Sequence, residues 1–243
     1  MNKKIQISAS MQCAPPLNLQ DSALTLAAVP IDLLHIDLMD ANFVPNLALN
    51  FDQVQALAQL APIPLDAHLM LLNPAQYLDR TIDAGASLVC FHVEACGDIA
   101  AMLKHIRSRN TKAGLAISPN TPLETLNPYL HLLDYLLVMA VEPGFSGQSF
   151  MPQTLDRLDK LSSHNIPIMV DGGIDEQNAI DCINHGATIL VAGAKCIFAP
   201  NKDLKKATLS LIDTCTASAV HLCMKDPSQN SHSRDDITHP CGG

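Results

Sequence analysis

Two apolar segments of this 243-residue chain each carry a histidine and an aspartate two positions apart. The first pair is His35 and Asp37, the second is Asp66 and His68, and Asp171 ends a third apolar segment. Residues two apart on a β-strand point to the same side, so each pair faces one space. Such polar groups in apolar surroundings are costly unless they are hydrogen-bonded, paired or metal-bound. The three segments therefore predict one polar site assembled from several strands.

The candidate ligands form a mixed nitrogen and oxygen set, made of His35, Asp37, His68 and Asp171. Such a set suits zinc, iron, manganese or cobalt better than calcium, so we expect one divalent metal ion per chain. By itself, His68 is better explained as a hydrogen-bonded core histidine, but four such residues on one face favour a metal site. Asp66 is either a hydrogen-bond partner that orients a ligand or a bystander. His92, followed by Glu94, also ends an apolar segment, and a place outside the site is favoured for it.

Glycines gather in the loops after the last three predicted strands. These positions are Gly144 and Gly147, then Gly172 and Gly173, then Gly193 with Ala194 beside it. Glycine lets backbone N–H groups approach a phosphate next to helix N-termini. The last two strands of an α/β barrel commonly form its phosphate-binding end, so we expect a phosphate group here. Lys195 would either add positive charge to this phosphate or point to solvent.

The elements that would position these residues alternate along the chain. Short apolar runs predict strands at 5–9, 33–38, 65–69, 88–92, 112–117, 135–139, 166–171 and 189–192. Amphipathic stretches predict helices at 19–28, 51–60, 74–84, 98–109, 123–129, 152–163, 176–185 and 203–214. Eight such units without a break in composition predict one (β/α)8 TIM barrel over residues 1–215, with a doubly wound open sheet as the alternative. The ligand-type residues would then lie near the carboxyl ends of strands, where barrels build their active sites.

Composition narrows the classes of function. The hydrophobic content of 48% is ample for a large core, and the net charge of −9 argues against nucleic-acid and anionic-membrane partners. The 8 cysteines, without a CxxC pair, are expected to be reduced thiols rather than disulfides. With no signal-peptide pattern and no apolar run long enough for a membrane span, a cytoplasmic location is expected. Residues 216–243 are polar and aperiodic, and we expect a disordered tail there.

The chain resembles the ribulose-phosphate 3-epimerase family over residues 5–212. The motifs that carry the resemblance are HIDLMD (35–40), NFVPN (42–46), LDAHLM (65–70), VMAVEPGFSGQ (138–148) and VDGGI (170–174). The resemblance implies a TIM barrel of the ribulose-phosphate-binding type that inverts carbon 3 of a ketose phosphate. It also implies a small sugar phosphate as substrate and assembly into homo-oligomers.

The resemblance also assigns roles to residues. His35, Asp37, His68 and Asp171 would hold the metal, and Asp37 and Asp171 would be the two acid–base groups. Inversion beside a carbonyl removes a proton from one face and returns one to the other, which two opposed carboxylates can do, while a metal stabilises the enediolate. The implied or expected substrate-binding residues are Ser10, His68, Met39, Met70, Met139, Gly144, Phe145, Ser146, Gly147, Gly172, Gly173, Gly193 and Ala194. For the three methionines, ordinary core packing is the alternative.

Three departures from the family pattern bear on the substrate. Ala41 stands where relatives usually carry glycine and would be strained if φ were positive. Residues 10–16 lack a usual aspartate, and Ala194 replaces a usual hydroxyl residue. These last two features look closer to an allulose-6-phosphate 3-epimerase branch. We expect conversion of D-ribulose 5-phosphate to D-xylulose 5-phosphate, with D-allulose 6-phosphate, giving D-fructose 6-phosphate, as the alternative.

Two further classes of function are less favoured. A non-catalytic sugar-phosphate-binding barrel would not need both Asp37 and Asp171. Decarboxylases of the same barrel type carry a lysine where this chain has Met39.

Overall fold

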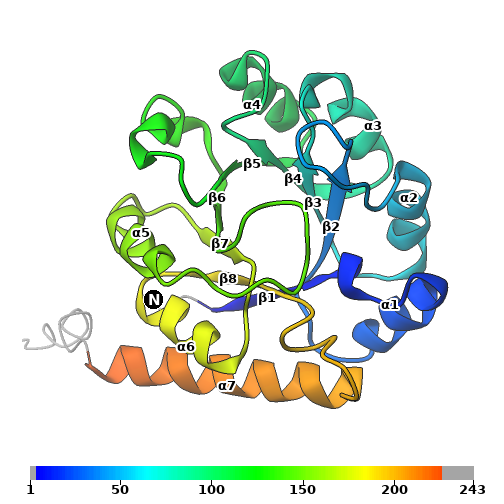
Figure 1. Ribbon diagram of the computed structural model, residues 1–243, viewed down its shortest axis with the longest axis vertical. Coiled ribbons are helices and arrows are strands. Elements are labelled where there is room, and N and C mark those ends of the chain that lie inside the picture. The colour runs from blue at the N-terminus through cyan, green and yellow to red at the C-terminus, as the bar shows by residue number, and fades with distance from the viewer. Residues whose placement is uncertain (1–3, 226–243) are drawn as a thin grey trace, which may run out of the picture.

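Eight parallel strands close into a barrel in the computed structural model, which describes residues 4–225. Figure 1 shows the strands in sequential order around the ring. They are β1 (Gln6–Ser10), β2 (Leu33–Met39), β3 (Leu65–Met70), β4 (Ala86–His92), β5 (Lys112–Ile117), β6 (Tyr135–Met139), β7 (Ile168–Asp171) and β8 (Ile189–Ala192). Because β1 pairs with β8, the sheet has no open edge. The predicted (β/α)8 TIM barrel is confirmed, and the open sheet is excluded.

Helices surround the barrel (Figure 1). They are α1 (Leu19–Ala27), α2 (Phe51–Leu60), α3 (Leu78–Asp83), α4 (Ile99–Ser108), α5 (Gln153–Ser162), α6 (Glu176–Asn184) and α7 (Leu204–Lys225). The side chains of Asn50, Asp98 and Asp175 cap α2, α4 and α6 by accepting a backbone N–H of the first turn. These caps set where the helices begin and so fix the length of the loops above the strands.

Two predicted helices differ from the structure. The predicted helix at 74–84 is divided into a 3₁₀ turn, Pro74–Gln76, and α3. The predicted helix at 123–129 is wrong, because the chain forms two 3₁₀ turns instead, Leu123–Leu126 and Leu130–Leu132. Pro128 lies between these turns and has no N–H with which to continue a helix.

The last helix is longer than predicted. α7 continues to Lys225, so the start of a disordered tail at residue 216 is wrong. Its apolar residues explain the difference: Leu211 and Cys215 are buried, and Leu222 packs against the same core. A helix with one buried face gains its stability from packing rather than from local propensity. Residues 226–243, the rest of the predicted tail, lie outside the described residues.

Alternation along the strands divides the apolar residues between two layers. In β2, Leu34, Ile36 and Leu38 belong to the main core between the sheet and the helices. Leu33 belongs to a separate cluster inside the barrel, so the alternate residues His35 and Asp37 share its side of the strand. The sequence pattern therefore places both polar residues inside the barrel.

Two expectations about composition can be compared with the structure. The cysteines whose environment is described are all free thiols: Cys13, Cys90, Cys96, Cys182, Cys196 and Cys215. Among residues 4–225, no helix combines the length and the apolar character that a membrane span requires.

Candidate active site

Four of the predicted ligands lie together inside the barrel. One ligand atom from each of His35, Asp37, His68 and Asp171 lies within 4.8 Å of all the others. Asp37 and His68 are register partners on the adjacent strands β2 and β3. Asp171 ends β7, which is separated from β2 by β1 and β8. Closure of the barrel, rather than proximity in sequence, brings this carboxylate to the other three.

The buried His35 ring is held so that one nitrogen faces the cluster. Its Nδ1 lies 2.7 Å from Asp66 Oδ2, so the ring donates its Nδ1 proton to that carboxylate. Nε2 is buried without a hydrogen-bond partner, although Asp37 Oδ1 lies 3.3 Å away and Asp171 Oδ2 lies 3.8 Å away. An unpartnered ring nitrogen that faces two carboxylates fits a metal ion. Asp66 is therefore the orienting partner of His35 rather than a bystander.

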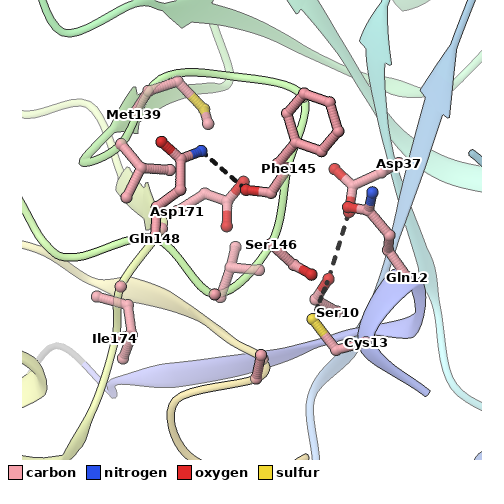
Figure 2. A pocket seen from close by; sticks show the side chains of 18 of the residues that line it. Ser10, Gln12, Cys13, Asp37, Met139, Phe145, Ser146, Gln148, Asp171 and Ile174 are labelled. Carbon is pink, nitrogen blue, oxygen red and sulfur yellow. Dashed lines mark hydrogen bonds between the residues drawn. The ribbon is translucent and has the colours of Figure 1, made fainter. Parts of the chain in front are cut away.

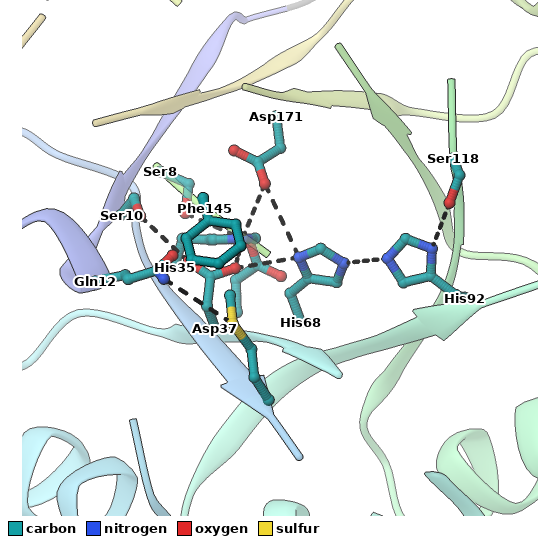
Figure 3. A network of polar contacts seen from close by, with 12 residues as sticks. Ser8, Ser10, Gln12, His35, Asp37, His68, His92, Ser118, Phe145 and Asp171 are labelled. Atoms are coloured by element: carbon teal, nitrogen blue, oxygen red, sulfur yellow. Dashed lines mark hydrogen bonds and ion pairs between the residues drawn. The ribbon is translucent and has the colours of Figure 1, made fainter. Parts of the chain in front are cut away.

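The second histidine faces the cluster through its other nitrogen. His68 Nδ1 lies 3.2 Å from Asp37 Oδ1 and 3.9 Å from Asp171 Oδ2. Its Nε2 points away from the cluster and lies 2.9 Å from His92 Nε2. Figure 3 shows His68 between His92 and the two aspartates. His92 is thus outside the four-residue cluster but connected to it.

The surroundings of the two aspartates shift their pKa values in opposite directions. Burial raises the pKa of Asp171 to about 6, and the nearby Asp37 charge acts in the same direction. Burial also opposes ionisation of Asp37, but the facing His35 and His68 outweigh it and hold the pKa of Asp37 below its usual range. Two neighbouring carboxyls whose pKa values are pushed apart are the pattern expected of an acid and a base.

The pKa values of the two histidines are also shifted in opposite directions by their surroundings. Burial alone would lower the pKa of His35, but the carboxylates of Asp37 and Asp66 raise it well above its usual value. Burial lowers the pKa of His68, and the neighbouring His92 acts in the same direction. Three carboxylates around the rings thus favour a cation at this point, which agrees with the donor set.

A pocket opens beside the cluster and is lined by all the predicted substrate-binding residues except His68. Figure 2 shows Ser10, Asp37, Met139, Phe145, Ser146 and Asp171 around it. The remaining predicted lining residues are also present: Met39, Met70, Gly144, Gly147, Gly172, Gly173, Gly193 and Ala194. Lys195 lines the pocket as well. His35 and His68 are fully buried and do not line it.

Several lining residues had no predicted role. They are Gln12, Cys13, Val141, Glu142, Gln148, Ile174 and Val191. Gln148 donates hydrogen bonds from its side chain to the carbonyls of Glu142 and Phe145, which shapes the loop after β6. Five of these residues, Gln12, Cys13, Val141, Glu142 and Ile174, lie two or three positions after the end of a strand, and that position was the available signal for them.

The glycine pair after β7 is required by the geometry. Gly172 and Gly173 have φ values of 108° and 67°, a region that side chains disfavour. A Cβ at Gly172 would lie 2.4 Å from the Val141 side chain, and one at Gly173 would lie 2.6 Å from the Phe150 backbone nitrogen. The backbone therefore lines the pocket directly, as a phosphate site made of N–H groups needs.

Comparison with known proteins decides the family. A sequence model of the "Ribulose-phosphate 3 epimerase family" matches residues 6–198. The chain belongs to this family. A ribulose-phosphate 3-epimerase of Aquifex aeolicus (strain VF5) is 36% identical over 193 residues, which cover 74% of this chain and 86% of the relative. One from Mycobacterium tuberculosis (strain ATCC 25618 / H37Rv) is 35% identical over 227 residues, covering 90% of this chain and 96% of the relative.

Family membership makes the chain an enzyme of the isomerase class, an epimerase. The names of these relatives do not favour the hexulose phosphate alternative. Solved structures agree with the fold: 3-keto-L-gulonate-6-phosphate decarboxylase from Vibrio cholerae matches with a TM-score of 0.66 at 14% identity. That match covers 90% of this chain and 98% of the other, and at such low identity it concerns the fold alone.

Proposed function

We propose that this epimerase interconverts D-ribulose 5-phosphate and D-xylulose 5-phosphate by two-base proton transfer at carbon 3. The observation that carries the proposal is the pair of carboxylates, Asp37 and Asp171, that line one pocket from separate strands. Inversion of a carbon beside a carbonyl needs an acid and a base on opposite faces of the substrate. The names of the relatives support the pentulose phosphate.

We propose that one divalent ion is held by His35 through Nε2, His68 through Nδ1, and the carboxylates of Asp37 and Asp171. The unpartnered Nε2 of His35 supports this assignment. When bound, such an ion would supply Lewis-acid stabilisation to the negative charge that develops on the enediolate oxygens. The donor set is compatible with zinc, iron, manganese or cobalt.

The two aspartates exchange roles with the direction of reaction. One carboxylate removes the proton at carbon 3 to give an enediolate, and the other, already protonated, returns a proton to the opposite face. Before any ion is bound, burial raises the pKa of Asp171 to about 6, so this carboxyl holds a proton closer to neutral pH than an ordinary aspartate does. Asp37, with its pKa lowered, is ready as a base. Ser10 Oγ lies 3.3 Å from Asp37 Oδ2 and would orient that carboxylate.

The rest of the pocket would bind and shield the substrate. The backbone at Gly172, Gly173 and Gly193, which lines the pocket, would donate N–H groups to the phosphate, and Lys195 would add positive charge. The side chains of Met39, Met70 and Met139 would form an apolar wall that keeps water from the enediolate.

Removing either acid–base group tests the mechanism. We expect Asp37→Asn and Asp171→Asn each to lower kcat by about 10²–10⁴-fold, the usual contribution of a positioned acid or base. Steady-state kinetics, with incorporation of solvent deuterium at carbon 3, measures this loss. Asp159→Asn, the same change beside the surface residue His185, is the matched control and should keep full activity. Activity near that of the wild type in either site variant would contradict the two-base mechanism.

The substrate is tested separately. We expect kcat/KM for D-ribulose 5-phosphate to exceed that for D-allulose 6-phosphate in parallel assays of one preparation. A higher value for the hexulose phosphate would overturn the substrate assignment and leave the carbon 3 chemistry intact.

A further inference from the structure

The proposed reaction gives no role to the polar side chains that continue from His68 on the side away from the four-residue cluster. His68 Nε2 lies 2.9 Å from His92 Nε2, and His92 Nδ1 lies 3.1 Å from Glu94 Oε2. Both rings are fully buried. The first of these contacts joins β3 to β4, and Figure 3 shows its two rings edge to edge.

Glu94, the last residue of this series, determines which atom donates in each of these hydrogen bonds. Glu94 has no proton to donate at neutral pH: burial opposes its ionisation, but hydrogen bonds from His92, the Thr121 hydroxyl and the Ser118 backbone N–H lower its pKa to about 2. His92 must therefore donate from Nδ1 to Glu94, and the Ser118 hydroxyl, whose Oγ lies 3.3 Å from the same nitrogen, is a second acceptor of that proton. A neutral ring that carries its proton on Nδ1 has a lone pair on Nε2. His92 Nε2 accordingly accepts the Nε2 proton of His68.

We infer that His92 and Glu94 are positioning residues that fix the tautomer of His68, so that its Nδ1 keeps a free lone pair for the metal. This inference rests on the metal centre proposed above. His35 shows the complementary arrangement, because Asp66 holds the proton on its Nδ1 and leaves Nε2 free. The two histidines thus face the cluster through opposite nitrogens, each selected by a different neighbour.

Replacing Glu94 by glutamine should exchange donor and acceptor in each of these hydrogen bonds. The backbone N–H of Ser118 faces the Oε1 position and must keep an oxygen there, so the amide NH2 takes the Oε2 position opposite His92. The amide then donates to His92 Nδ1, His92 donates from Nε2 to His68 Nε2, and the proton of His68 moves to Nδ1. A protonated Nδ1 cannot ligate a metal ion.

The test measures Zn²⁺ affinity and the tautomer of His68. We expect Glu94→Gln to weaken Zn²⁺ binding by about 10–100-fold in competition with a chelator, the range typical of groups that orient metal ligands. Long-range ¹H–¹⁵N spectra of histidine-labelled protein should place the His68 proton on Nε2 in the wild type and on Nδ1 in metal-free Glu94→Gln. Asp159→Asn is again the matched control, because it changes a carboxylate 2.8 Å from Nδ1 of the surface residue His185.

A second variant keeps the inference testable if Glu94→Gln does not fold. His92→Phe keeps a ring but removes the acceptor of His68 Nε2, and should also weaken Zn²⁺ binding. Zn²⁺ binding by Glu94→Gln equal to that of the wild type, with His68 protonated on Nε2, would overturn the inference alone. Absence of Zn²⁺ binding to the wild type, or no loss of it in Asp171→Asn, would instead overturn the proposed metal centre.

Discussion

Ala41 occupies a backbone conformation that costs energy for any residue with a side chain. Its φ is 57°, and its N–H donates to the carbonyl of Asn46 in the loop after β2. The carboxylate of Asp40 reinforces this loop by accepting the backbone N–H groups of Asn42 and Phe43. The left-handed region costs an L-residue roughly 1–2 kcal/mol. The loop therefore keeps its shape at an energetic cost that glycine would not bear.

Ala41→Gly should stabilise the protein. Glycine removes the strain but loses roughly 0.5–1 kcal/mol of backbone entropy on folding, so we expect the free energy of unfolding to rise by about 0.5–1 kcal/mol. The exposed Ala41 methyl group contributes little packing to offset this gain. Urea denaturation measures the change. The matched control is Ala56→Gly in α2, an exposed helical position where the same substitution should lower stability. A loss of stability in Ala41→Gly would contradict the assigned strain.

Single residues were predictable from the sequence where their burial or backbone conformation costs free energy. His35 and Asp37 were predictable because polar groups in an apolar strand need partners. The strain predicted for Ala41 depended on a positive φ, and the structure meets that condition. The role inferred for His92 was not predictable. It depends on which nitrogen of His68 faces the cluster, and that requires the orientation of both rings.

Glu94 connects the ends of two neighbouring strands. It follows β4 and accepts the N–H of Ser118 and the hydroxyl of Thr121, which both follow β5. Burial opposes its ionisation, but these bonds and the one from His92 lower the pKa of Glu94 to about 2. Its side chain is 25% exposed, so solvent screens part of the interaction. The ionised carboxylate therefore stabilises the fold above its unfolded pKa, and that stability is lost as pH falls through the folded value.

This linkage predicts a pH-dependent difference between the wild type and Glu94→Gln. The stability advantage of the wild type should be greater at pH 6 than at pH 3 by about 1–2 kcal/mol, because between these values Glu94 takes up a proton in the unfolded wild type and glutamine takes up none. Urea unfolding of both proteins across this range, with a chelator present, measures the difference. A difference that is constant with pH would show that the carboxylate charge of Glu94 does not stabilise the fold.

Elements were predictable wherever hydrophobic periodicity and caps coincide. All eight strands were predicted close to their true positions, because buried parallel strands are short apolar runs. The helix predicted at 123–129 was wrong because the apolar pattern there fits a helix, whereas Pro128 prevents one. The predicted end of α7 at residue 214 was too early. Polar residues in the sequence beyond it obscured the apolar pattern of the buried face, which includes Leu211, Cys215 and Leu222.

Barrel closure is what turns separate strands into a site. Asp171 is 134 positions after Asp37, yet their carboxylates lie in one cluster because β1 and β8 complete the ring between β2 and β7. Four ligand-type side chains on three strands would be drawn together by one bound ion. Metal binding should therefore stabilise the whole barrel and not only the loops around the pocket.

Metal-linked stability tests this at the scale of the molecule. At a free Mn²⁺ concentration of about 100 times Kd, binding to the folded state alone adds about 2.7 kcal/mol to the free energy of unfolding. For a chain of this size we expect Tm to rise by roughly 5–11 °C, and a chelator should reverse the rise. Mn²⁺ is chosen because thiolates of the unfolded chain bind it less readily than they bind softer metals. His35→Gln should lose the shift, whereas His105→Gln, which changes a surface histidine paired with Asp79, should keep it. An equal shift in both variants would locate the bound ion elsewhere than the cluster inside the barrel.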